Sequence, residues 1–256
     1  MMMAATATYS SAQQAVLLYA AGSLRAALSE VANSFETAHG VKIEAKFGPS
    51  GLLRDEIAGG AKAEVFASAN MAHPESLAKA NRSGAAQMFA RNRLCALVRP
   101  GLGVTRYTLL DHLLDPSVKV GTSTPKADPA GDYAFESFAK ADKLRPGSRA
   151  ILEKKALQLT GGPNSAPPPA NRSVYGALIA GGQADIFLTY CTNAVAAVRE
   201  NADQLVVALP DPLAVGAEYG LIVMNGASAN AAKFATYILG AEGQQLLAKH
   251  GFAPPL

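Results

Sequence analysis

Two serines stand at the start of two successive helical segments, each shortly after an apolar run. Ser23 follows AVLLYA in "AAGSLRAALSEVANSF", and Ser50 follows VKIEAKF in "FGPSGLLRDEIAGGA". The first turn of a helix has backbone N–H groups without intrahelical partners and carries partial positive charge. A serine hydroxyl adds a donor there, and Gly22 and Gly51 let a ligand approach the backbone closely. Two such turns at the carboxyl ends of neighbouring strands are suited to hold a small oxyanion.

Each serine also has a simpler explanation, because serine is a common N-terminal helix cap.

Other chemistries have less support. GPSGLL is not a nucleophile elbow, since Leu52 stands where G-x-S-x-G requires glycine. Neither a phosphate loop nor a G-x-G-x-x-G motif after a strand is present. The scattered positions of the histidines predict solvated surface rather than a metal site or a catalytic base. These are His39, His73, His112 and His250.

The elements that must position these residues alternate between strand and helix. Short apolar or alternating runs predict strands at 15–20, 41–47, 63–69, 92–100, 117–125, 184–191, 203–210 and 218–224. Helical spacing predicts helices at 23–40, 51–60, 73–84, 130–141, 148–159, 174–183 and 230–251. Residues 160–173, rich in proline and glycine, are expected to form a surface loop. Such alternation favours mainly parallel sheets with helices on both faces.

Composition limits the function classes. The chain has 256 residues, 49% of them apolar and 17% charged, which suits a globular protein of one large domain or two lobes. A net charge of +3 without a Lys/Arg block argues against a nucleic-acid partner. No apolar run approaches the roughly 20 residues of a membrane-spanning helix. The small, polar residues 1–14 are expected to be a signal remnant or a disordered leader, and their lack of a full signal pattern does not exclude export.

The two cysteines, Cys95 and Cys191, have no metal-binding spacing. Two buried thiols and one disulfide are both compatible with them, the latter in an oxidising compartment.

Four segments resemble the periplasmic molybdate-binding proteins of ABC importers. They are "AAGSL", "FGPSGLLRDEIAGGAKAEVFASAN", "DPAGDYA" and "ADIFLTY", and the resemblance extends from about Ala15 to the terminal "HGFAP". The block that begins with GPSG is the most specific part, and the loops of the second half are the least specific. The resemblance implies a two-lobed periplasmic-binding-protein fold, in which each lobe is a mixed, mainly parallel sheet flanked by helices.

The resemblance also implies a set of ligand-binding residues, because that family holds its oxyanion with uncharged donors. The two serines correspond to Ser23 and Ser50, and the tyrosine corresponds to Tyr190. Backbone N–H donors fall at Ala130 and, in the least alignable region, at Val174. No catalytic residue, resident cofactor or metal beyond the central atom of the oxyanion is implied. Uncharged donors suit a permanent dianion. A site without acceptors rejects a protonated oxyanion, because the O–H group of that anion would find no hydrogen-bond partner.

Asp128 and Asp132 depart from the family pattern. A carboxylate that pointed into the cleft would either repel a dianion or coordinate the central metal atom of the ligand. Both residues therefore bear on the identity of the ligand.

We therefore expect residues 15–92 and 211–256 to form one lobe and residues 93–210 to form the other, with the ligand in the cleft between them. The expected function is capture of molybdate or tungstate in the periplasm and delivery to the membrane subunits of an ABC permease, by a monomer that is not an enzyme. The alternatives are a binding protein for sulfate, phosphate, a phosphonate or ferric ion, a serine hydrolase, and a cytosolic oxyanion sensor. The hydrolase lacks a positioned base, and the sensor lacks a visible helix-turn-helix segment.

Overall fold

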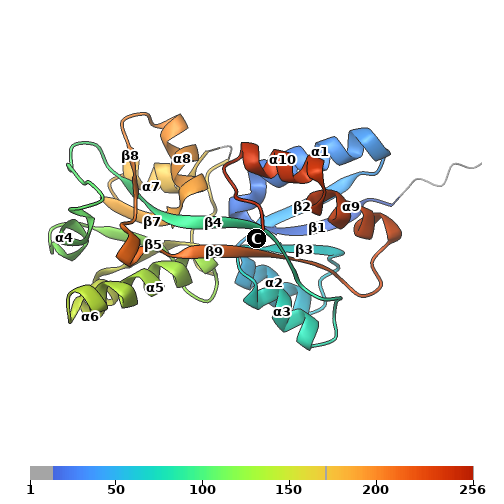
Figure 1. The fold of residues 1–256 in the computed structure, drawn as a ribbon, viewed down its shortest axis with the longest axis horizontal. Helices are drawn as coiled ribbons and strands as arrows, with labels where there is room; N and C mark the ends of the chain where they lie inside the picture. Colours follow the sequence, from blue (N-terminus) through green and yellow to red (C-terminus); the bar gives the residue numbers. More distant parts are fainter. Residues whose placement is uncertain (1–13, 171, 256) are drawn as a thin grey trace, which may run out of the picture.

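The computed structural model describes residues 14–170 and 172–255, and its strands form a nine-stranded sheet that continues through two halves of the molecule (Figure 1). The strand order is β2-β1-β3-β9-β4-β7-β5-β6, with β8 paired to β4. Residues 1–13 of the expected leader lie outside the described residues.

The first half is built from strand–helix units. Its strands are β1 (Val16–Ala21), β2 (Ile43–Gly48) and β3 (Val65–Ser68), and its helices are α1 (Arg25–His39), α2 (Ser50–Ala58) and α3 (Ala72–Lys79). β1 pairs in parallel with both β2 and β3, so the carboxyl ends of these strands lie at one edge of the sheet. A 3-10 turn, Gly22–Leu24, leads from β1 into α1, and α2 begins two residues after β2. Ser23 and Ser50 therefore follow the ends of adjacent strands.

Two long antiparallel strands cross between the halves. They are β4 (Gln87–Val98) and β9 (Gly216–Val223), and together they run through the centre of Figure 1. β9 pairs with β3 in the first half, whereas β4 pairs with β7 (Ile186–Tyr190) and β8 (Leu205–Ala208) in the second. The two α/β lobes that the family resemblance implies are therefore present, and these strands join them.

The second half repeats the strand–helix pattern. β5 (Val120–Ser123) pairs in parallel with β6 (Leu157–Thr160) and with β7. The helices are α4 (Leu109–Leu114), α5 (Pro129–Leu144), α6 (Ser148–Lys155), α7 (Val174–Ala180) and α8 (Cys191–Glu200). Helix α5 follows β5, and α8 follows β7. Helix α7 begins after the loop that follows β6. Parallel sheet within each half thus combines with antiparallel pairing where the crossing strands join them.

The helix expected at 148–159 is wrong at its carboxyl end, because α6 stops at Lys155 and residues Leu157–Thr160 form β6. The sequence ALQLT supports either structure over so short a run, and pairing with β5 decides it.

The chain returns to the first half after β9. A 3-10 turn, Asp211–Leu213, precedes β9, and the helices α9 (Ala229–Leu239) and α10 (Ala241–Lys249) follow it. Both helices lie beside α1 in Figure 1. Arg91 on β4 and Ala253 exchange backbone hydrogen bonds of 2.8 and 2.9 Å, which fix the terminal segment against the crossing strands.

Each half has its own hydrophobic core. The larger cluster in the first half includes Phe35 and Phe234, whose rings are 5.1 Å apart, and the second half packs around Phe138 and Phe187 in two smaller clusters. The first cluster also takes in Ala130 and Tyr190 from the second half, so the two halves are in contact there. The boundaries of the expected lobes stay a prediction. In the described part of the chain, no helix is long and apolar enough to cross a membrane.

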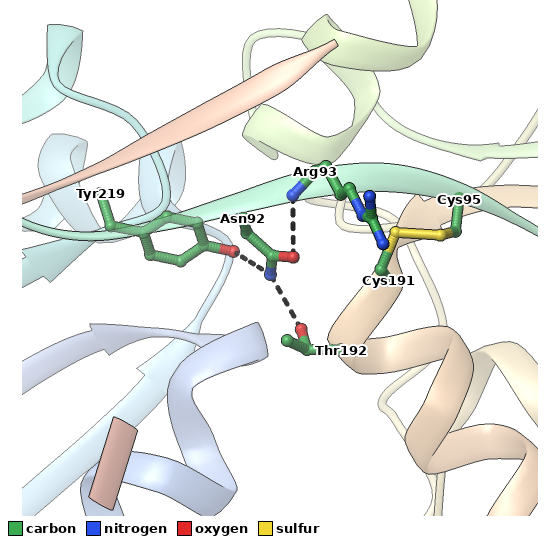
Figure 2. Close-up of a disulfide and its surroundings, with 6 residues drawn as sticks. All are labelled: Asn92, Arg93, Cys95, Cys191, Thr192 and Tyr219. Carbon is green, nitrogen blue, oxygen red and sulfur yellow. Dashed lines mark hydrogen bonds between the residues drawn. A yellow bond between two sulfur atoms is a disulfide. The ribbon is translucent and has the colours of Figure 1, made fainter. Parts of the chain in front are cut away.

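Cys95 on β4 and Cys191, the first residue of α8, form a disulfide across 96 residues of chain. The bond ties the start of α8, and with it the adjacent Tyr190, to a strand that crosses between the halves (Figure 2). Of the two possibilities left open by the sequence, the structure has the disulfide.

Candidate functional site

Ser50 is the first residue of α2, and its side chain is enclosed although it is polar. It is 1% exposed, and its Oγ accepts a hydrogen bond of 3.1 Å from the backbone N–H of Ala69, just after β3. Because Oγ acts as an acceptor in this bond, its own proton remains available for another oxygen.

Ser23 lies in the turn before α1 and forms a hydrogen bond of 3.0 Å with Tyr219 of β9. The Tyr219 hydroxyl also receives a longer hydrogen bond, 3.4 Å, from the side-chain amide of Asn92 on β4. That amide donates at 2.9 Å to Thr192 on α8 as well (Figure 2). When Tyr219 donates to Ser23, the serine proton is free for a ligand, and each donor in the chain polarises the next.

Tyr190 ends β7 and is 1% exposed. Its hydroxyl lies 3.4 Å from the carbonyl oxygen of Ala69, and its ring centroid is 5.5 Å from that of Tyr219. Burial raises the pKa of Tyr190 well above its usual value of about 10, so the side chain is a neutral hydrogen-bond donor at physiological pH.

Tyr133 on α5 reaches the same carbonyl oxygen of Ala69 at 3.5 Å, and its ring centroid is 6.2 Å from that of Tyr190. Both tyrosine bonds to Ala69 are long for an O–H···O contact, so neither hydroxyl is firmly held. Burial raises the pKa of Tyr133 to about 12. We call Ser23, Ser50, Tyr133, Tyr190 and Tyr219 the hydroxyl cluster.

The structure thus brings together three of the five residues expected at the site. Ser23 comes from the turn before α1 and Ser50 from the start of α2, both in the first half, and Tyr190 comes from β7 of the second. Tyr133, Tyr219 and Asn92 belong to this arrangement and were missed from the sequence. The sequence offered one signal for Tyr219, which is its position in the predicted strand "EYGLIVM", between a charged residue and an apolar run.

Ala130 lies at the N-terminus of α5 and is buried in the same core cluster as Tyr190 and Tyr219. Its N–H donates at 3.0 Å to a carboxylate oxygen of Asp128, which caps the helix. The donor expected to face a ligand is therefore engaged by a side chain of the protein itself.

Val174 begins α7, and its side chain packs with the core around Phe187. Within the described residues, no hydrogen bond or aromatic contact joins Val174 to Ser23, Ser50 or Tyr190. Burial raises the pKa of the neighbouring Tyr175, and the negative charge of Asp128 adds to this increase. The ligand-binding roles of Ala130 and Val174 stay predictions.

The two halves touch beside Ser50. The N–H of Gly51 donates at 2.9 Å to the carbonyl oxygen of Ala127, in the loop before α5. Lys126 has a positive φ of 69°, a conformation that side chains rarely adopt. The carbonyl oxygen of Lys126 lies so close to Gly51 that a methyl group on the α carbon of Gly51 would clash with it. The N-terminus of α2 thus docks directly on the second half.

A cavity of about 1260 Å³ lies next to the hydroxyl cluster without including its serines. Tyr133 lines both, and Asn92 and Thr192 lie on the cavity wall. Acidic and basic side chains both line the cavity: Glu75, Arg91, Arg93, Asp132, Arg199, Glu218 and Lys249. In the described residues, no group of three or more His, Cys, Asp or Glu side chains is placed to hold a metal ion.

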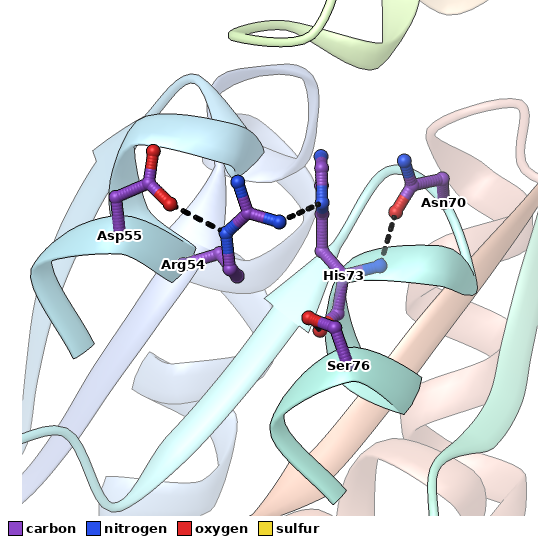
Figure 3. Close-up of polar contacts among 5 residues, drawn as sticks. All are labelled: Arg54, Asp55, Asn70, His73 and Ser76. Carbon is purple, nitrogen blue, oxygen red and sulfur yellow. Dashed lines mark hydrogen bonds and ion pairs between the residues drawn. The ribbon is translucent and has the colours of Figure 1, made fainter. Parts of the chain in front are cut away.

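The expectation that all four histidines are solvated is wrong for His73. This residue, in the first turn of α3, is 8% exposed, and burial next to Arg54 lowers the pKa of its ring to about 4 (Figure 3). Its backbone N–H donates to Asn70, and its carbonyl accepts from Ser76. The His73 ring is therefore uncharged at neutral pH and packs beside Arg54 of α2. It makes no hydrogen bond to the hydroxyl cluster.

Comparison with known proteins places this arrangement in a family. Residues 16–253 match the sequence family described as bacterial extracellular solute-binding protein. The chain is 34% identical over 240 residues to an uncharacterised protein of Pasteurella multocida, covering 93% of this chain and 98% of the relative. It is 26% identical over 261 residues to the molybdate-binding protein ModA of Mycobacterium tuberculosis, covering 94% of this chain and 85% of the relative.

Solved structures have the same fold at low sequence identity. The periplasmic molybdate-binding protein of Azotobacter vinelandii superposes with a TM-score of 0.75 at 18% identity, covering 94% of this chain and 100% of that one. The sulfate-binding protein SubI of Mycobacterium tuberculosis gives 0.77 at 19% identity, with 94% and 87% covered. The periplasmic binding protein AfuA of Actinobacillus pleuropneumoniae, bound to fructose-6-phosphate, gives 0.72 at 14% identity, with 93% and 82% covered.

The matched family consists of solute-binding proteins, which bind substrates without converting them, so the chain is not an enzyme, and the alternative of a serine hydrolase falls away. The match covers nearly the whole described chain, from β1 to the segment after α10. With its two halves, crossing strands and interlobe hydroxyls, the chain belongs to the bacterial extracellular solute-binding proteins, the type that serves ABC importers.

Proposed function

We propose that the hydroxyl cluster binds a tetrahedral oxyanion of the molybdate or tungstate class, and that the protein carries it, as a monomer in the periplasm, to an ABC permease. The observation that supports this most is the hydroxyl cluster itself. Ser23, in the turn before α1, bonds to Tyr219, and both Ser50 of α2 and Tyr190 of the other half contact the backbone of Ala69. Hydroxyls from both halves thus contact Ala69 or Tyr219, which suits a cleft that closes on a small ligand.

The chemistry of the donors fits a permanent dianion. Serine and tyrosine hydroxyls carry no formal charge, and the raised pKa values of Tyr133, Tyr190 and Tyr219 keep those three protonated. Several uncharged donors distribute partial positive charge over the ligand oxygens, and hydrogen bonds to a charged acceptor are stronger than bonds between neutral groups. Enclosure of the ligand between the halves then strengthens each interaction.

The relatives support the ligand class without deciding it. The Mycobacterium tuberculosis relative and the Azotobacter vinelandii protein are both molybdate-binding proteins. Sulfate and a sugar phosphate are the ligands of two other proteins with this fold, so the anion must be chosen by experiment.

Isothermal titration calorimetry with molybdate, tungstate, sulfate and phosphate tests the proposal. We expect molybdate or tungstate to bind with one site per chain and more tightly than the other two anions. A ligand at about a thousand times its Kd should also stabilise the fold by about 4 kcal/mol, which thermal unfolding detects. Binding of none of the four anions would refute the proposal, and preferential binding of sulfate or phosphate would replace the ligand class.

A further inference from the structure

Asp128 places a carboxylate at the N-terminus of α5, next to the hydroxyl cluster. One of its oxygens accepts the Ala130 N–H at 3.0 Å, and Ala130 shares a core cluster with Tyr190 and Tyr219. The carboxylate therefore occupies a hydrogen-bond donor that the proposed function would direct at a bound anion. An aspartate at this position is also an ordinary helix cap, so its surroundings decide whether it does more.

The surroundings of Asp128 enclose the carboxylate without a cation. Gly161, at a φ of 78°, packs so closely that a methyl group there would lie 2.6 Å from one carboxylate oxygen. Ser123 at the end of β5 is fully buried, and its hydroxyl has no hydrogen bond of ordinary geometry although it lies beside Asp128. Among the described residues, no lysine, arginine or histidine forms an ion pair with Asp128.

The titratable groups that interact electrostatically with Asp128 come from four elements. They are Asp132 on α5, Tyr175 on α7, Tyr190 on β7 and Tyr219 on β9. Burial raises the pKa of each of these tyrosines above its usual value, so all three stay neutral up to pH 9. Asp132 has a pKa that is raised by burial, and its carboxylate accepts the backbone N–H of Lys126 at 2.8 Å.

Burial, supported by the charge of Asp132, raises the pKa of Asp128 to about 6 before any ligand is present. At pH 7 the side chain is therefore mostly ionised, but its proton is easily regained. A dianion in the hydroxyl cluster adds negative charge near this carboxylate, and two like charges in one site favour protonation of the weaker acid.

We propose that capture of a dianion by this cleft is coupled to the uptake of one proton at Asp128. The proton comes from solvent and bonds to a carboxylate oxygen, while the ligand remains a dianion and no other bond is made or broken. Protonation removes the competing charge from the start of α5 and converts Asp128 from an acceptor into a group that also donates. This inference rests on the proposed function, since it concerns the same site.

The sign of the pH dependence follows from linkage. Above pH 6 the free protein has lost the proton that the complex retains, so the apparent Kd for a dianion should rise by about tenfold per pH unit. Below pH 6 the free and bound forms carry the same proton at Asp128, and the Kd should become independent of pH. The coupling therefore favours binding of dianions in mildly acidic surroundings.

Calorimetry with molybdate and sulfate, which stay dianions from pH 6 to 8.5, tests the inference in the wild type, Asp128→Asn and Asp132→Asn. The asparagine amide oxygen at 128 can still accept the Ala130 N–H, so the cap is kept while the charge is removed. We expect the wild type and Asp132→Asn to weaken with rising pH, and Asp128→Asn to bind equally well throughout and more tightly than wild type at pH 8.

Titration of the wild type at pH 7.5 in two buffers of different ionisation enthalpy gives the number of protons directly and needs no variant. Uptake close to one proton supports the inference. Binding with no proton uptake, or a pH dependence that persists in Asp128→Asn, overturns it and leaves the proposed function standing. Failure of every dianion to bind at any pH overturns both.

Discussion

Ser23 and Ser50 contribute the same group to the cluster but are supported differently. Ser50 Oγ is held by the backbone N–H of Ala69. Ser23 is held by Tyr219, whose hydroxyl receives a further hydrogen bond from Asn92. Replacement of either serine by alanine removes one donor to a charged ligand. We expect each change to cost about 1.5–3 kcal/mol of binding, which is roughly a tenfold to 150-fold increase in Kd by calorimetry.

Ser34→Ala is a matched control for these variants. Ser34 lies on α1 and forms a 2.8 Å hydrogen bond with Tyr237, so the change also removes a serine–tyrosine contact, but one outside the hydroxyl cluster. Its Kd should equal that of the wild type. If Ser23→Ala and Ser50→Ala both bind like Ser34→Ala, the ligand does not lie between these serines.

Residues at helix starts were easier to predict than their partners. Ser23 and Ser50 could be singled out because strand, small turn and helix follow one another within a few residues. Tyr219 and Asn92 could not, since Tyr219 meets Ser23 across 196 residues and Asn92 meets Thr192 across 100. Such pairings depend on how β4 and β9 cross, which local patterns do not encode. The burial of His73 depends likewise on the packing of α2 against α3.

At the scale of elements, the start of α2 is where one half docks on the other. Gly51 contacts the loop residues Lys126 and Ala127, and a methyl group at Gly51 would lie 2.8 Å from the Ala127 carbonyl oxygen and closer to that of Lys126. Gly51→Ala should leave the helix intact, because alanine is a better helix former than glycine. It should oppose the contact between the halves and weaken ligand binding by about fivefold to 150-fold, through a steric cost of about 1–3 kcal/mol.

Gly84→Ala is the control for this prediction, since a methyl group at Gly84 has no atom within 4 Å. Calorimetry and unfolding without ligand should be compared for both variants. Wild-type affinity in Gly51→Ala would mean that the contact between α2 and the loop before α5 is not needed for binding.

Element prediction failed where a run was too short to show its period. Leu157–Thr160 continues the apolar spacing of the preceding helix, yet it pairs in parallel with β5. Four residues fit a strand and one turn of a helix equally well, and only the partner strand distinguishes them. Longer segments such as α1 and α5 carry several repeats of the helical spacing, which is why their type was predictable.

At the scale of the whole molecule, the disulfide links two distant parts of one half. Cys95 on β4 and Cys191 at the start of α8 close a long loop, which restricts the unfolded chain. The double variant Cys95→Ala/Cys191→Ala should lower the free energy of unfolding by about 2–4 kcal/mol in denaturant titrations. Wild-type protein with dithiothreitol should approach the stability of the variant. Equal stability of the oxidised wild type and the variant would contradict a stabilising role.

The overall architecture was more predictable than the site because alternating strands and helices restrict the possible topologies to few. The alternation indicated mainly parallel sheets flanked by helices, and the family resemblance added the division into two lobes. The cysteine pairing did not, since 96 residues separate the two positions and their approach depends on β4 lying against β7. A disulfide of this kind persists in an oxidising compartment, which supports the proposed periplasmic location.

A single oxyanion is proposed to lie between hydroxyls of both halves. Crystals grown with tungstate and measured at the tungsten absorption edge locate the heavy atom directly. We expect the strongest anomalous peak within about 4 Å of Ser23 Oγ, Ser50 Oγ and the Tyr190 hydroxyl, the distance that a metal–oxygen bond and a hydrogen bond span when they meet at an angle. A peak in the neighbouring cavity of about 1260 Å³, away from both serines, would contradict it.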